Sequence, residues 1–175
     1  MLTHTRAVPT GQERFFDTEE IIVSKTDCTG KILYANDVFL RVSGYDEAEL
    51  LGAPHSIIRH PDMPRAVFKL LWDTVESGHE IFAYVNNMAR SGDYYWVLAH
   101  VTPSFDRDGR IVGYHSNRRC PDRSAIAKVA PLYDQLRDIE RSFPDRKDGL
   151  VASVARLEGI LASAGVSYHE WVWSL

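Results

Sequence analysis

The segment "HSIIRHPDMPRAVF", from His55 to Phe68, concentrates the residues of this sequence that could do chemistry. It holds two histidines, two arginines, one aspartate and two prolines among apolar residues. Imidazole, guanidinium and carboxylate groups at this density can bind a metal ion, take part in acid–base catalysis or line the mouth of a ligand pocket. The spacing of the residues distinguishes these three roles.

Metal binding and catalysis are the weaker interpretations of this segment. His55 and His60 lie five residues apart in a stretch that contains proline, and no cysteine is near them. This spacing does not supply three or four converging metal ligands. The chain also lacks a Gly-x-Ser-x-Gly motif and a glycine-rich phosphate loop, so we expect no enzymatic activity. A histidine elsewhere, at position 79, 100 or 115, could still ligate haem iron.

A ligand pocket fits the segment better. A planar cofactor joined to a pyrophosphate needs an apolar slot, a few hydrogen-bonding groups and positive charge at the phosphates. Ile57 and Ile58 can form walls of such a slot, while Arg59 can bind phosphate. His60 can donate a hydrogen bond, and the start of the helix after Asp62 offers free N–H groups and a positive dipole end. Two plainer roles stay open: a pure helix cap for Asp62 and a surface ion pair for Arg59.

Two short strands and two short helices are predicted before this segment. The strands are Ile21–Lys25 and Ile32–Tyr34, joined by a turn that contains glycine. Asn36 is placed to cap a short helix that Gly44 ends. Asp46 begins the second helix and has a glutamate three residues later, which is the spacing of a capping box.

A longer helix and three long strands are predicted after this segment. Phe68, Leu71, Trp72 and Val75 form one apolar helix face, and Gly78 follows as a stop. The next three stretches are rich in β-branched and aromatic residues and are separated by the turn sequences "RSGD" and "DRDG". This order predicts an α+β fold in which a five-stranded antiparallel sheet carries short helices on one face.

The last part of the chain, residues 121–175, is predicted to be a helical extension. Its first helix follows the apolar repeat Ile126, Val129, Leu132, Leu136 and Ile139. Pro131 is expected to kink or split that helix. The extension either covers a face of the sheet or serves as a signalling or dimerisation helix, and Trp171 and Trp173 near its end favour the second role.

Composition limits the class of protein. The 175 residues carry a net charge of −4 and show no basic stripe interleaved with aromatics, so we expect no nucleic-acid partner. The longest apolar runs fall far short of the roughly 20 residues needed to cross a bilayer, so a cytoplasmic protein is expected. Cys28 and Cys120 are too few and too far apart to indicate a disulfide framework.

The order of elements and several spaced motifs resemble one sensor family. "RHPDMP", the helix around Trp72, "GDYYWV" and the Gly-Tyr-x-Ser-x-Arg pattern at the end of the last strand resemble the PAS domain of bacterial aerotaxis receptors. The resemblance covers about residues 20–120, which leaves residues 1–19 as an N-terminal arm or cap. Covalent flavin photochemistry is not expected, because light-sensing flavin domains of this fold carry Asn-Cys-Arg where this chain has "SIIRHPD".

The resemblance implies a redox sensor that binds FAD non-covalently and reports its state to a chemoreceptor or kinase module. The apolar stripe of the helical extension adds the expectation of a homodimer. The family's flavin-binding positions correspond to Arg59, His60 and Asp62. Further positions on or near the pocket correspond to Asn36, Phe68, Trp72 and Asn87. Two alternatives remain: a PAS sensor for haem or another small ligand, and a cofactor-free PAS module used for dimerisation.

Overall fold

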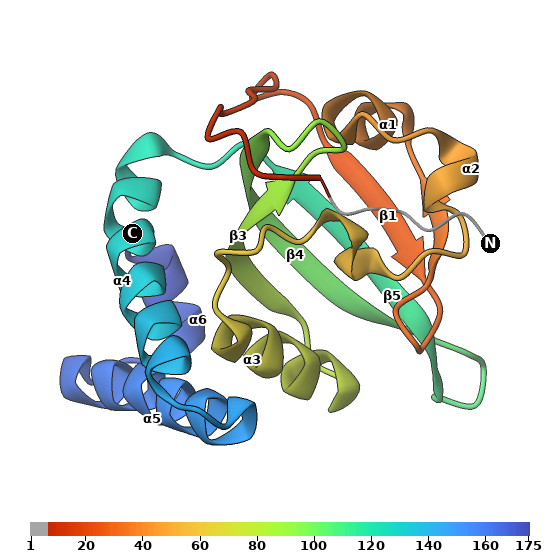
Figure 1. The fold of residues 1–175 in the computed structure, drawn as a ribbon. Helices are drawn as coiled ribbons and strands as arrows, with labels where there is room; N and C mark the ends of the chain where they lie inside the picture. The colour runs from red at the N-terminus through yellow and green to blue at the C-terminus, as the bar shows by residue number, and fades with distance from the viewer. Residues whose placement is uncertain (1–6) are drawn as a thin grey trace.

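The computed structural model describes residues 7–175 and shows an antiparallel sheet with helices on one face and at one edge (Figure 1). The strands are β1 (Ile22–Thr26), β2 (Ile32–Ala35), β3 (Ile81–Met88), β4 (Tyr94–Phe105) and β5 (Ile111–Arg119). The helices are α1 (Asp37–Ser43), α2 (Glu47–Leu50), the 3₁₀ helix η1 (His55–Ile58), α3 (Arg65–Glu76), α4 (Arg123–Ser142), α5 (Arg146–Ala164) and α6 (Tyr168–Trp173).

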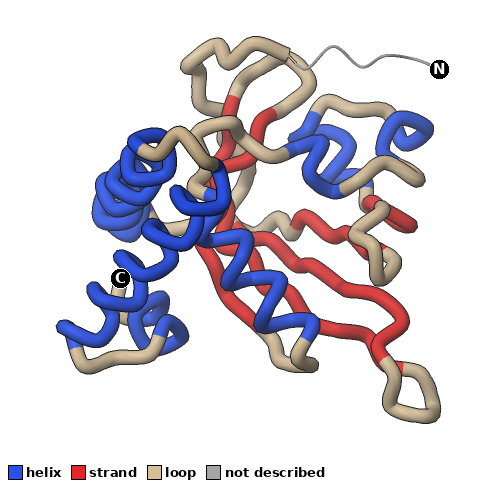
Figure 2. Tube along the Cα trace, turned by 60° about the horizontal axis from the view of Figure 1, so that its bottom comes forward, coloured by secondary structure: helices blue, strands red, loops and turns tan. Residues whose placement is uncertain are grey.

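The sheet order is β2-β1-β5-β4-β3, so strands from the two ends of the sequence meet in the centre. β1 pairs with β5 through the register Ser24↔Ser116, and β5 pairs with β4 through Val101↔Ser116. The predicted α+β fold with a five-stranded antiparallel sheet is therefore confirmed. Figure 2 shows how the helices gather on one side of the sheet and leave the β4–β5 hairpin projecting from the other end.

The short helices begin and end at the residues predicted from sequence. The Asn36 side chain accepts a hydrogen bond from Phe39 N at 3.1 Å, which caps α1, and Gly44 closes the helix with φ of 70°. Asp46 and Glu49 form the expected capping box at α2. The same Asn36 oxygen also accepts from Val23 N at 2.9 Å, so this side chain joins α1 to β1.

Helix α4 runs without a break through Pro131, so of the two predicted effects of this proline, a kink or a split, the split is wrong. Proline removes one backbone N–H, and the helix continues because Val129, Tyr133 and Leu136 on either side of Pro131 are buried. Tyr133, two residues after the proline, is buried and donates a hydrogen bond to the carbonyl of Tyr84 on edge strand β3 at 2.7 Å. The extension therefore covers the β3 edge, and Figure 1 shows α4, α5 and α6 grouped beyond that strand.

The end of the extension is only partly buried. Trp173 on α6 is 57% exposed, and its ring lies 4.8 Å from the ring of Phe82 on β3. The packing of α6 against β3 thus accounts for one face of this tryptophan and leaves the other in solvent.

The described part of the N-terminal arm, residues 7–19, lies along the turn between β3 and β4 and contains no helix. Glu13 pairs with Tyr94 in a parallel bridge, and Arg14 forms an ion pair with Asp93 at 3.0 Å. Hydrogen bonds from Thr10, Ser91 and Arg14 lower the pKa of Asp93 to about 2. The first six residues of the predicted arm lie outside the described part of the chain.

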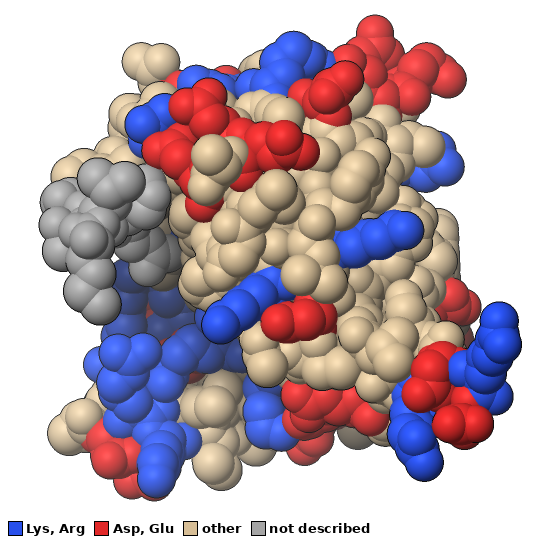
Figure 3. Space-filling view, turned by 90° about the vertical axis from the view of Figure 1, so that its right-hand side faces the viewer, with Lys and Arg blue, Asp and Glu red and all other residues tan. Residues whose placement is uncertain are grey.

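Charge is mixed over the surface. On the side that Figure 3 shows, the centre is mostly uncharged, several basic groups gather at the lower left, and acidic and basic groups adjoin at the top and the lower right. No helix within the described residues has both the length and the apolar character needed to cross a bilayer.

Candidate functional site: a cavity between the sheet and helix α3

A cavity of about 320 Å³ lies between the inner face of the sheet and the segment from η1 to α3. Pockets of about 300–1,000 Å³ are the usual size for small ligands and cofactors. Alternate residues of the strands face it, as the pleat requires. The residues lining it from the sheet are Ser24, Thr26, Val85, Asn87, Ala99, Val101, Tyr114, Ser116 and Arg118. The remaining lining residues are Thr29, Gly30, Pro54, His55, Ser56, Arg59, Phe68, Leu71 and Trp72.

The outer part of the cavity is aromatic. The rings of Trp72 and Tyr114 meet edge to face with centroids 5.4 Å apart, and the guanidinium of Arg59 lies 3.6 Å from the centre of the Phe68 ring. Gly30 has φ of +80°, and a Cβ there would lie 3.1 Å from the Trp72 ring. The turn between β1 and β2 can therefore approach Trp72 closely only because position 30 has no side chain.

The inner end of the cavity holds a buried cation. Arg118 on β5 is 2% exposed, donates to Ser24 Oγ at 2.5 Å and lies 4.4 Å from the centre of the Phe39 ring. Burial lowers the pKa of the Arg118 guanidinium to about 10, so the group stays charged at neutral pH. Its Nε and Nη1 atoms have no acceptor among the described residues.

His55 lies beside this cation. Its Nε2 atom is 3.0 Å from Ser24 Oγ, and its ring stacks on Phe39 with centroids 6.0 Å apart. Burial, reinforced by the positive charge of Arg118, lowers the pKa of His55 to about 3. The imidazole is therefore neutral at physiological pH, and among the described residues that line the cavity only Arg59 and Arg118 carry a formal charge.

The polar atoms of the cavity call for a ligand rich in acceptors. No aspartate or glutamate is among the lining residues, while Thr26 Oγ1 and Asn87 Nδ2 are buried without a partner in the described chain. A buried charge or donor that lacks a counterpart is costly, and a ligand that supplies one recovers that free energy. A flavin ring, which is flat and apolar at one end with carbonyl oxygens and ring nitrogens at the other, fits this arrangement.

Four of the seven predicted site residues line the cavity: Arg59, Phe68, Trp72 and Asn87. Arg59 and Asn87 also pair through an isolated antiparallel bridge, which attaches the segment after η1 to the edge of β3. Asn36 is not a lining residue, because its side chain is used to cap α1 and to bond β1.

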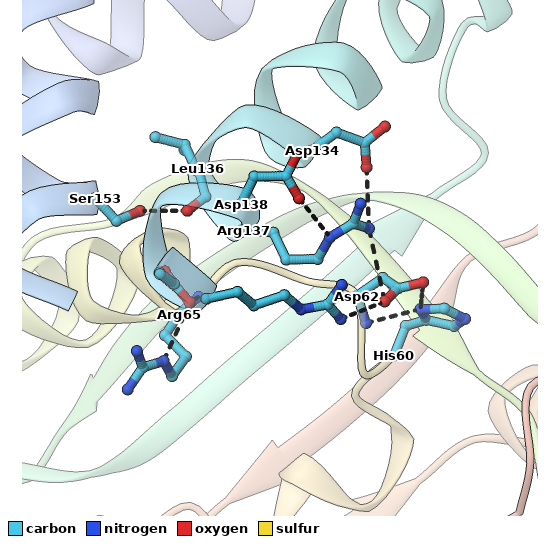
Figure 4. Close-up of polar contacts among 10 residues, drawn as sticks. His60, Asp62, Arg65, Asp134, Leu136, Arg137, Asp138 and Ser153 are labelled. Carbon is cyan, nitrogen blue, oxygen red and sulfur yellow. Dashed lines mark hydrogen bonds and ion pairs between the residues drawn. The ribbon is translucent and has the colours of Figure 1, made fainter. Parts of the chain in front are cut away.

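His60 and Asp62 are not among the residues that line the cavity. Figure 4 shows the Asp62 carboxylate directed at Arg137 of α4, with the His60 ring beside it. His60 is 6% exposed, and its Nδ1 accepts a hydrogen bond from the backbone of Asp62 at 3.1 Å. The Asp62 carboxylate lies 3.6 Å from Arg137 and 3.1 Å from Arg141, both on α4. Both residues border a second, separate groove beneath that helix.

The predicted cap of helix α3 is wrong. Asp62 makes no capping bond, since the helix begins at Arg65 after Pro64. The carboxylate of Glu140 from α4 accepts hydrogen bonds from Arg65 N at 3.0 Å and from Ala66 N at 2.9 Å instead. The N–H groups that we expected to be available to a phosphate are thus already occupied.

The predicted apolar walls also differ from the observed ones. Ile58 is 1% exposed and belongs to the hydrophobic core, and neither Ile57 nor Ile58 lines the cavity. The apolar wall on this side comes from Phe68, Leu71 and Trp72 of α3.

Sequence reasoning missed Arg118 and His55 as cavity residues. A signal for Arg118 was present, because Tyr114, Ser116 and Arg118 alternate along β5 and therefore share one face. Whether that face pointed inward became clear only from the pairing of β5 between β1 and β4. The histidines considered for haem, His79, His100 and His115, are not among the cavity's lining residues.

A five-stranded antiparallel sheet in this order, with helices enclosing a cavity against one face, defines a PAS domain. Residues 32–118 match the protein-family model described as PAS fold. The chain thus carries a PAS sensor domain, and the family predicted from the sequence motifs is confirmed.

The sequence of this domain is similar to those of individual known proteins. The chain is 44% identical over 115 residues to the aerotaxis receptor of Escherichia coli (strain K12), covering 66% of this chain and 22% of the receptor. It is 29% identical over 99 residues to a nitrogen fixation regulatory protein of Klebsiella pneumoniae, covering 57% of this chain and 20% of that protein. The chain spans about a fifth of the length of these curated relatives.

Solved structures agree with this assignment. The dark structure of the blue-light photoreceptor Aureochrome1 LOV superposes with a TM-score of 0.55 at 26% identity, covering 68% of this chain and 86% of that chain. The chain is therefore similar to domains of sensory receptors, both in sequence and in fold.

Proposed function

We propose that this chain is a redox sensor, not an enzyme, that binds FAD non-covalently in the cavity and relays the state of the flavin to a signalling partner. The observation that carries the proposal is the combination of an apolar, aromatic slot with the buried and uncompensated Arg118. The resemblance to aerotaxis receptors supports the same cofactor. FAD, when bound, supplies a ring that takes up and releases electrons reversibly.

The cavity residues have distinct roles in this proposal. Leu71 and Trp72 exclude water from the apolar part of the ring. Arg118 and Asn87 donate hydrogen bonds to the acceptor-rich edge, and Arg118 favours any negative charge that develops there. His55 stays neutral, so it adds no second positive charge beside Arg118.

Asn87 is the natural starting point of the relay. It lies on β3, pairs with Arg59 and has a free donor inside the cavity. A change in hydrogen bonding at the edge of the flavin ring would change the hydrogen bond that the Asn87 amide can make. Strand β3 would then transmit that change to the helices packed on its edge. We propose a chemoreceptor or kinase module as the output partner and a cytoplasmic homodimer as the working form.

An absorption spectrum of the freshly purified protein tests the cofactor. The expected result is a two-band flavin spectrum, with FAD released on heating and identified by chromatography. A protein that purifies colourless and takes up no added FAD would contradict the proposal and leave a PAS module that acts through dimerisation alone.

A haem sensor is the second outcome that the spectrum separates, by a strong Soret band. Among the lining residues only His55 offers an imidazole, and its Nε2 atom lies within hydrogen-bond distance of Ser24. Haem ligation at this histidine would have to displace that contact, which favours flavin over haem.

A further inference from the structure

The N-terminus of α3 is held by a side chain from the far end of the sequence. The carboxylate of Glu140 accepts hydrogen bonds from the backbone N–H groups of Arg65 and Ala66 and from Arg65 Nε, at 3.0, 2.9 and 3.1 Å. The Glu140 side chain is 7% exposed. Figure 4 shows Arg65 near the ion pairs of Asp62 and Arg137.

This contact replaces a local cap. The first N–H groups of a helix have no partner within the helix and are normally satisfied by a side chain just before it. Pro64 occupies that position and has no side-chain acceptor. A carboxylate at a helix N-terminus is also favoured by the helix dipole, so Glu140 is well suited to fix where α3 begins.

Helix α3 is a wall of the cavity. Arg65 and Ala66 lie one turn before Phe68, and Phe68, Leu71 and Trp72 all line the cavity. A helix moves as a rigid unit over a few turns, so a shift at the Glu140 contact displaces those three side chains relative to the sheet.

Helix α4 also contacts the opposite wall. Tyr133 donates to the carbonyl of Tyr84 on β3, three residues before Asn87 on the same strand. Helix α4 of the extension therefore touches both α3 and β3, and each of these two elements supplies part of the cavity wall.

The second helix of the extension reinforces the position of Glu140. Gly149 on α5 packs so tightly that a Cβ there would lie 2.6 Å from the carbonyl oxygen of Glu140. Ser153 Oγ donates to the carbonyl of Leu136 at 3.2 Å, one turn earlier on α4. The backbone that carries Glu140 is thus fixed by α5.

We propose that Glu140 is a positioning residue that sets the α3 wall of the cavity and so couples ligand binding to the docking of α4 and α5. The proposal rests on the proposed function, because it takes FAD as the ligand. Coupling between two binding events is reciprocal. Loosening the docking of α4 and α5 therefore lowers the affinity for the ligand, and bound ligand favours that docking by the same factor.

The test compares Glu140→Gln with Glu158→Gln in the full chain. Glu158 is an exposed residue of α5, and its replacement removes the same charge without removing any hydrogen bond to α3 seen among the described residues. We expect amide hydrogen exchange in ligand-free α3 to become about tenfold faster in Glu140→Gln and to stay unchanged in the control. We also expect FAD to bind about tenfold more weakly to Glu140→Gln than to the wild type. Added FAD is expected to slow amide hydrogen exchange in α4 and α5 of the wild type but not of this variant.

The two arms separate the failure of this inference from that of the proposed function. Unchanged exchange in α3 overturns the positioning role whether or not FAD binds. FAD affinity within twofold of the wild type in a folded Glu140→Gln protein overturns the coupling. A wild type that takes up no FAD overturns the coupling together with the proposed function, while the exchange in α3 still decides the positioning role. If Glu140→Gln does not fold, Glu140→Asp keeps the charge and retracts it by one methylene, and the same exchange and affinity criteria apply to it.

Discussion

The cavity and the contact between α3 and α4 lie on the two sides of one helix but balance their charges differently. In the cavity, Arg118 is buried and no carboxylate lines the site. At the α3–α4 contact, Arg65 pairs with Glu140, and two arginines of α4 pair with Asp62. A contact whose charges are matched is complete in itself, whereas a buried charge that has no carboxylate beside it indicates a place for a ligand.

The same contrast divides the motif from which the sequence analysis began. Arg59 faces the cavity, while His60 and Asp62 face α4. A motif that looks like a single site in the sequence thus serves two purposes in the structure. The resemblance assigned all three residues to the cofactor, but the geometry favours contact for Arg59 and positioning for the other two.

The largest expected effect concerns the unmatched cation. Arg118→Met is expected to weaken FAD binding roughly 100-fold, or about 3 kcal/mol, because it removes charged donors from a buried site. The ligand-free protein is expected to be no less stable, since an uncompensated buried charge is lost. Calorimetric titration with FAD and thermal melts measure the two effects, with Arg118→Lys as the charge-retaining control. Equal FAD affinity in wild type and Arg118→Met would show that the buried charge of the cavity does not serve ligand binding.

The pH dependence of stability gives the next effect. The pKa of His55 is lowered to about 3 in the folded protein, while an unfolded histidine titrates near 6.5. Between these values the unfolded state binds the extra proton, so this contribution to stability is fully present above about pH 6.5 and declines as the pH falls toward 3. At pH 5 the loss is about 2 kcal/mol.

Urea denaturation at pH 7 and pH 5 measures this loss. His55→Gln is expected to reduce the difference in unfolding free energy between the two pH values, while His79→Gln, at an exposed position outside the cavity, leaves it as in the wild type. The same pH difference in His55→Gln and wild type would show that this ring is not held neutral by the cavity.

The smallest expected effect concerns the stability of the contact between α4 and β3. Tyr133→Phe removes the hydrogen bond to the Tyr84 carbonyl and is expected to lower the unfolding free energy by about 1 kcal/mol. Chemical denaturation measures it, and Tyr34→Phe, at a largely exposed position on β2, is the control. A loss no greater than that of the control would mean that the edge of β3 is held by apolar packing alone.

Local patterns predicted the elements of this fold well. The Asn36 cap, the Asp46 capping box and the succession of strands along the chain all depend on residues close in sequence. Alternation along β3 likewise places Asn87 and Val85 on one face.

What the sequence could not provide depends on distant contacts. The cap of α3 comes from Glu140, 75 residues after Arg65, and no local pattern joins the two. The continuity of α4 through Pro131 depends on the surfaces that pack against it, and local propensity alone predicts the opposite. The inward direction of Arg118 depends on which face of β5 is covered by η1 and α3, and that is a property of the whole fold.

The close approach of Gly149 to the Glu140 carbonyl has a consequence for how this protein varies among its relatives. Any larger residue at position 149 forces α5 away from α4, and Glu140 then loses the backbone position from which it reaches α3. Glycine at 149 and glutamate at 140 are therefore expected to covary, kept together where the paired helices follow the PAS domain and lost together where they do not. An alignment of such proteins would record this constraint as a correlated pair of columns.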